Sequence, residues 1–202
     1  MKTTAAVMLM LAVPAGAAPP EVQTEADEYT RYELLAPETA QFRIVYEVSA
    51  TSAGANVYFN AIRKGSEATN EAVYDRLTGR LLPFGIVSGA EARRGGAADA
   101  DLETSYIRIE LPRAVPADGE VRLLVDKTYR DPTSYFRDGP LVVFSRTLAI
   151  QRNSVVLPRG YELVACNVPA QVLSDEDGRI LVSFMNPFPV EAPVVVKARR
   201  LP

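Results

Sequence analysis

The chain has 202 residues, 48% of them hydrophobic and 23% charged, and its formal net charge at pH 7 is -3. This slightly acidic balance, with charges of both signs interspersed, argues against nucleic-acid binding. The sequence contains no His, the usual general base and commonest metal ligand, and no Trp, the strongest sugar-stacking platform.

Residues 1–17 have the pattern of a secretory signal peptide. The apolar core at 5–13 is too short to span a bilayer as a helix, and small residues up to Ala17 fit the cleavage rule. Residues 18–28 are Pro-rich and then acidic, so we expect a flexible acidic leader. No other run approaches the roughly 20 apolar residues of a transmembrane helix. We therefore expect a bacterial periplasmic or secreted protein without a transmembrane segment.

Residues 29–202 have the pattern of a β-sandwich domain. In 41–50, Phe42, Ile44 and Tyr46 alternate with other side chains at the period of two that is typical of a half-buried strand. Three Asp-Gly pairs stand between apolar runs and predict tight hairpins rather than helical crossovers. We therefore expect an all-β fold, an antiparallel β-sandwich. Further strands are predicted at 31–35, 56–62, 71–77, 80–87, 103–111, 120–130, 141–144, 170–173, 179–185 and 194–199.

The segment 88–101 is the strongest break in composition after the leader. It is small, Gly-rich and charged. Two interpretations remain open: a linker that marks an internal boundary between two packed β units, or a long loop within one sandwich. Loops above about 12 residues without structure are uncommon in compact domains, which favours the linker somewhat.

Cys166 is the only cysteine, so an intramolecular disulfide is excluded. Val164 and Val168 lie on the same side of the predicted strand, which favours a buried small hydrophobe over a reactive thiol. The Asp175-Glu176-Asp177 cluster offers carboxylates of the kind that calcium binds. The further ligands of a calcium loop do not follow it, so an exposed hairpin tip is favoured. We expect no metal and no cofactor.

The predicted binding residues are Tyr129, Arg130, Tyr135, Phe136 and Arg137. They flank an Asp-Pro pair, which predicts a loop, and loops lie on the surface. Aromatic and arginine side chains together are typical of binding surfaces. The alternative is that Tyr135 and Phe136 fold back onto the sandwich.

A strict period of two places Arg146 and Arg152 on the same face as the apolar Phe144 and Leu148. An inward arginine needs a paired acid. We therefore favour a β-bulge near Ser145, which would shift the phase of the strand, over an ion pair at the rim of the sandwich.

The sequence resembles a group of exported bacterial β-domain proteins, and this resemblance implies no activity. It is carried by the passages YFNAIRKGS, TGRLLPFGIVSG, KTYRDPTSYF, RNSVVLPRGYELVACNVPAQV and DGRILVSFMNP. More remotely, the all-β pattern is similar to the N-terminal β-domain of gluzincin-type zinc aminopeptidases. The H-E-x-x-H zinc motif of that family does not occur in this sequence, so the resemblance implies no peptidase function.

These observations predict a non-enzymatic module for recognition or scaffolding in the periplasm or envelope, with an unidentified protein or glycan partner. One alternative is a carbohydrate-binding module, which would need a coplanar aromatic surface. The other is an unrecognised hydrolase, which would need two inward carboxylates about 5–10 Å apart.

Overall fold

The computed structural model describes residues 27–186 and 191–202. The predicted signal peptide and most of the predicted leader lie outside these residues. Glu28, the last residue assigned to the leader, is buried, and its carboxylate accepts a hydrogen bond from the Tyr46 hydroxyl. Glu28 therefore belongs to the folded domain. No helix in the described part of the chain is long and apolar enough to cross a membrane.

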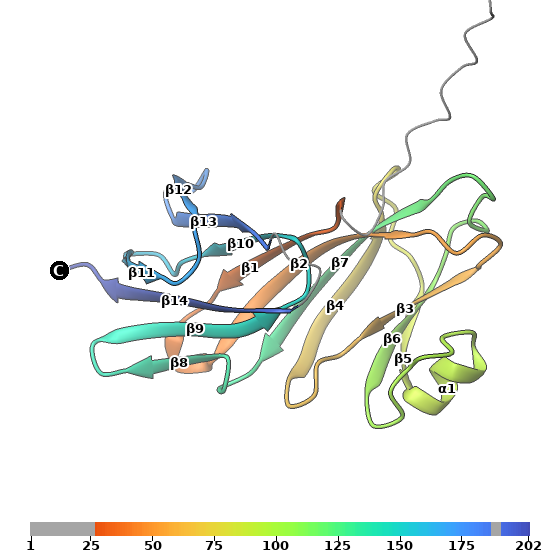
Figure 1. Cartoon of the computed structure of the whole chain (residues 1–202), viewed down its shortest axis with the longest axis horizontal. Coiled ribbons are helices and arrows are strands. Elements are labelled where there is room, and N and C mark those ends of the chain that lie inside the picture. The colour runs from red at the N-terminus through yellow and green to blue at the C-terminus, as the bar shows by residue number, and fades with distance from the viewer. Residues whose placement is uncertain (1–26, 187–190) are drawn as a thin grey trace, which may run out of the picture.

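The strands form three sheets, as expected for an all-β sandwich (Figure 1). The strand order is β12-β13-β10-β1-β2-β7-β4 in the seven-stranded sheet, β11-β14-β9-β8 in the four-stranded sheet and β3-β6-β5 in the three-stranded sheet. Among the described strands, β1 and β10 form the one parallel pair. The strands are β1 (Tyr29–Leu34), β2 (Gln41–Ala50), β3 (Val57–Ala61), β4 (Glu67–Asp75), β5 (Phe84–Ser88), β6 (Ser105–Glu110), β7 (Val121–Arg130), β8 (Tyr135–Asp138), β9 (Leu141–Leu148), β10 (Arg152–Val156), β11 (Tyr161–Cys166), β12 (Gln171–Ser174), β13 (Ile180–Met185) and β14 (Ala192–Arg200), with a 3-10 turn η2 (Pro37–Thr39) between β1 and β2.

Two hydrophobic cores lie along the seven-stranded sheet, one towards each smaller sheet. The long strand β2 contributes Phe42 to the core shared with the four-stranded sheet and Val48 to the core shared with the three-stranded sheet. The neighbouring strand β7 likewise contributes Tyr129 to the first core and Val125 to the second. Both cores are thus built on the same two strands.

The segment 88–101 contains a helix, α1 (Gly89–Arg94), and connects two strands of the same sheet. The strands on its two sides, β5 and β6, pair with each other from Phe84–Ile109 to Ser88–Ser105. Ser88 and Glu91 form a capping box at the start of α1, which satisfies free N–H groups there. Ala92 is buried in a small third cluster. The structure therefore replaces the linker interpretation by that of a structured loop.

The burial predicted for Cys166 and its neighbours holds only in part. A register shift between Leu163 and Ala165 in β11 changes the phase of the strand. As a result Val164 is 45% exposed instead of facing the interior, and the expectation that it lies in a core strand is wrong. Cys166 is half-buried against the first core.

Candidate functional site

A pocket of ≈ 340 Å³ lies where the two cores adjoin. Its wall comes from β9 of the four-stranded sheet, from β3 of the three-stranded sheet, and from β1, β2 and β7 of the seven-stranded sheet. Among the described lining residues Glu191 is the only carboxylate. The lining residues used below are Ile44, Tyr46, Asn60, Arg63, Lys127, Tyr129, Arg146, Leu148, Ile150 and Glu191.

Lys127 is the most unusual residue of this pocket. It occupies the inward face of β7 between Val125 and Tyr129, and it is only 4% exposed. Its Nζ donates a hydrogen bond to Asn60 Oδ1 at 2.5 Å and lies 4.9 Å from the centroid of the Tyr129 ring. Within the described part of the chain, no carboxylate lies within ion-pair distance of this ammonium group. Lys127 was not among the predicted binding residues, although it shares the alternation of its apolar neighbours on β7.

The electrostatic surroundings of Lys127 favour its neutral form. Burial lowers its pKa, the positive charge of Arg146 lowers it further, and the negative charge of Glu71 partly opposes them, which leaves the pKa at about 7. The Lys127 side chain thus titrates near neutral pH rather than near 10.5, its ordinary value.

Arg146, the second buried cation of the pocket, points inward because it has an acid to pair with. The pairing of β9 with β14 runs without a register shift from Leu141 to Leu148, so the bulge predicted near Ser145 is wrong. Arg146 Nη1 lies 3.1 Å from Asp131 Oδ2, and the two side chains are 5% and 3% exposed. The Arg146 guanidinium also lies 5.3 Å from the centroid of the Phe42 ring.

Asp131 is held by the loop that follows β7. Its carboxylate accepts hydrogen bonds from the backbone N–H groups of Thr133 and Ser134, from both of their hydroxyls, and from the Ser66 hydroxyl. Burial by itself raises the pKa of Asp131, but these hydrogen bonds outweigh burial and bring it down to about 2. Asp131 is therefore a fixed negative charge that compensates Arg146.

The five predicted binding residues do not share one surface. Tyr129 and Tyr135 are 2% and 0% exposed, and the Tyr135 hydroxyl donates to the backbone oxygen of Leu35. Both tyrosines belong to the first core, because β7 continues to Arg130 and β8 begins at Tyr135, so that alternate side chains turn inward. The prediction that all five residues form one exposed patch is therefore wrong. Only Arg130, Phe136 and Arg137 lie at the surface, where Arg137 is paired with Glu38.

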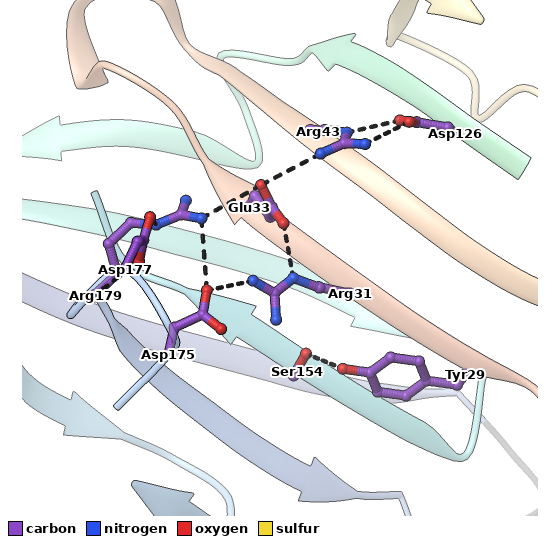
Figure 2. A network of polar contacts seen from close by, with 9 residues as sticks. All are labelled: Tyr29, Arg31, Glu33, Arg43, Asp126, Ser154, Asp175, Asp177 and Arg179. Carbon is purple, nitrogen blue, oxygen red and sulfur yellow. Dashed lines mark hydrogen bonds and ion pairs between the residues drawn. The ribbon is translucent and has the colours of Figure 1, made fainter. Parts of the chain in front are cut away.

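Asp175 and Asp177 of the Asp175-Glu176-Asp177 cluster are part of a network of ion pairs (Figure 2). The β1 residues of this network, Arg31 and Glu33, alternate with the buried Tyr32 and Leu34 and so lie on the opposite face of the sheet from the first core. Asp175 lies 2.5 Å from Arg31, and Asp177 lies 2.7 Å from Arg179. Glu33 lies among the guanidinium groups of Arg31, Arg43 and Arg179, and Arg43 reaches Asp126. Among the described residues, no group of three or more His, Cys, Asp or Glu side chains could hold a metal ion.

Comparison with known proteins identifies the fold. No family model matches the sequence, and no curated protein matches it. An M1 zinc metallopeptidase from Deinococcus radiodurans is similar in structure, with a TM-score of 0.52 and 9% sequence identity over 85% of this chain and 41% of that chain. A two-domain M1 zinc metallopeptidase bound to L-arginine gives a TM-score of 0.51 and 10% identity, with the same coverage of 85% and 41%.

The fold resembles the N-terminal β-domain of M1 zinc aminopeptidases. The remote resemblance seen in the sequence is thereby confirmed at the level of the fold. The chain spans about two fifths of the length of these solved proteins. At such low identity the likeness shows the architecture alone.

Proposed function

We propose that the chain is a non-enzymatic recognition module of the periplasm or envelope, and that it binds its ligand in the pocket between the two cores. The observation that carries this proposal is Lys127, a buried lysine beside a solvent-reaching pocket, with no carboxylate partner among the described residues. A buried charge without a partner costs several kcal/mol. Strongly perturbed ionisable groups in a cleft are typical of functional sites.

Two further observations support a role in binding rather than in peptide hydrolysis. The structural likeness to M1 metallopeptidases covers 41% of their length, which corresponds to their N-terminal β-domain. The sequence contains no His and therefore cannot form an H-E-x-x-H zinc motif. The apolar, small-residue pattern at 1–17 supports export.

The test is native mass spectrometry of the protein purified from the periplasm of cells that express the full chain. We expect a small molecule to copurify with the wild type and with Lys197→Met, and to be lost from Lys127→Met. Lys197 is a matched control because it lies on β14 between the buried Val196 and Ala198 and so points away from the core. Failure of the chain to reach the periplasm would contradict the localisation. Equal recovery of the ligand by Lys127→Met would contradict the site.

A further inference from the structure

We infer that this pocket binds the carboxylate group of a small, otherwise apolar molecule, with Lys127 as the charge partner of that carboxylate. The inference rests on the proposed function, because it names the class of ligand for the same site.

The first argument is the balance of charge inside the pocket wall. Of the two buried cations, Arg146 is compensated by Asp131 at 3.1 Å. Lys127 has no such partner within the described residues, and its one hydrogen bond goes to a neutral amide, Asn60. A proton on Lys127 therefore places a positive charge in the pocket wall that no described side chain compensates. A bound monoanion compensates this charge and stabilises the protonated form of Lys127.

The second argument is the supply of hydrogen-bond donors. An ammonium group has three donors, and Lys127 uses one of them on Asn60. Arg63, which lines the same pocket and is exposed, uses one guanidinium donor on the Thr147 backbone oxygen at 2.9 Å. Its other donors remain for an anion, so a carboxylate has a charged donor on the wall and another beside solvent.

The third argument is the apolar part of the lining. Ile44 from β2, Leu148 from the end of β9, and Ala149 and Ile150 beyond it lie around the same space. A pocket of ≈ 340 Å³ is at the lower end of the range for small-molecule sites, which is roughly 300–1,000 Å³. A charged group at one end of a short hydrocarbon body matches this lining better than a sugar or a phosphate does.

Other charged and titratable groups around Lys127 do not replace the missing partner. The negative charge of Glu71 raises the pKa of Lys127 without an ion-pair contact, and Glu28 accepts a hydrogen bond from the Tyr46 hydroxyl. Glu191 lines the pocket but is exposed. Besides Lys127, the titratable groups that line this space are Tyr32 from β1, Tyr46 from β2, Arg63 after β3, Tyr129 from β7, Arg146 from β9 and Glu191 before β14.

The test is isothermal titration calorimetry of the full chain at pH 7.5 with straight-chain carboxylates from acetate to octanoate. Inorganic phosphate and the matching primary alcohols are titrated beside them. We expect the affinity for carboxylates to rise with chain length until the pocket is filled. Phosphate and the alcohols should bind at least tenfold more weakly than the best carboxylate.

Variants assign the binding to Lys127. Lys127→Met should weaken the best carboxylate at least tenfold, Lys127→Arg should retain more affinity than Lys127→Met, and Lys197→Met should bind as the wild type does. Titration in two buffers of different ionisation enthalpy should reveal proton uptake on binding, because the anion stabilises charged Lys127. This uptake should vanish in Lys127→Met. Thermal melts followed by circular dichroism verify that each variant is folded.

The outcomes separate the inference from the proposed function. Tighter binding of phosphate, equal binding of the alcohols, or unchanged binding by Lys127→Met would overturn the carboxylate inference. If no carboxylate binds but a neutral or cationic molecule copurifies with the wild type and not with Lys127→Met, the inference fails and the recognition site stands. If no carboxylate binds and nothing copurifies, both fail.

Discussion

Arg146 and Asp131 form an almost fully buried ion pair that ties β9 to the loop after β7. The distance from Nη1 to Oδ2 is 3.1 Å, and the side chains are 5% and 3% exposed. Ser134 is hydrogen-bonded to both partners, since its hydroxyl donates to Asp131 and lies 3.3 Å from Arg146 Nη1. Each charge is therefore desolvated and depends on the other.

Removing one partner of this pair should destabilise the domain strongly. Asp131→Ala leaves the Arg146 guanidinium buried without a counter-charge, and we expect a loss of about 3–5 kcal/mol in the free energy of unfolding, measured by urea titration. Glu38→Ala is the control, because it breaks an exposed ion pair with Arg137 and should cost less than about 1 kcal/mol. Equal costs for the two variants would show that the buried pair contributes no more than an exposed one.

The same carboxylate should govern part of the acid sensitivity. The pKa of Asp131 is lowered from 3.8 to about 2, since hydrogen bonds from Thr133 and Ser134 outweigh burial. The unfolded chain binds the proton more readily, so this contribution is fully present above pH 4 and is lost as the pH falls towards 2. Unfolding titrations between pH 2 and 5 should show a smaller slope for Asp131→Asn than for the wild type. An unchanged slope would assign the acid sensitivity to other carboxylates.

Lys127 should make the domain more stable as the pH rises above neutrality. Its pKa is lowered to about 7 from 10.5, so between these values the unfolded chain holds a proton that the folded chain has released. The free energy of unfolding then rises with pH, by at most about 1.4 kcal/mol per pH unit from this group. Urea titrations from pH 7 to 10 should show the rise in the wild type and in Lys197→Met. Persistence of the full rise in Lys127→Met would contradict this assignment.

Gly89 should tolerate no side chain. A Cβ at this position would lie 2.0 Å from the backbone oxygen of Asp101, so Gly89→Ala must push α1 away from the loop that follows it. We expect a loss of about 1–3 kcal/mol in the free energy of unfolding. Gly85→Ala is the control, because nothing lies within 4 Å of its Cβ, and it should change stability by less than about 0.5 kcal/mol. Stabilisation by Gly89→Ala would show that the loop yields without cost.

Period-two alternation predicted the two long central strands of the large sheet, but it missed β10 and placed β4 four residues too far along the chain at its start. The strand predicted at 41–50 is β2 (Gln41–Ala50), and that predicted at 120–130 is β7 (Val121–Arg130). The sequence pattern did not predict the helix α1 or the register shift in β11. The helix α1 is too short for a helical stripe, and the register shift before Ala165 leaves no trace in the pattern of β11.

The candidate site was predictable only in part. The alternation rule placed Arg146 correctly on the inner face, but an inward arginine was rejected because its acid partner was unknown. That partner, Asp131, lies 15 residues away in a loop, and only the tertiary structure brings the two together. Lys127 could have been found, since it interrupts the apolar face of β7. The sequence could not show that no carboxylate of residues 27–186 or 191–202 pairs with Lys127.

The strands β2 and β7, which contribute to both cores, also make the domain one cooperative folding unit. Loss of the four-stranded sheet would expose β2 and β7, and the three-stranded sheet packs on the same two strands. Neither core can therefore stay folded without the other. Heat should therefore melt the molecule in one step. A ligand bound beside Lys127, where the two cores adjoin, should therefore stabilise both cores and raise the single melting temperature.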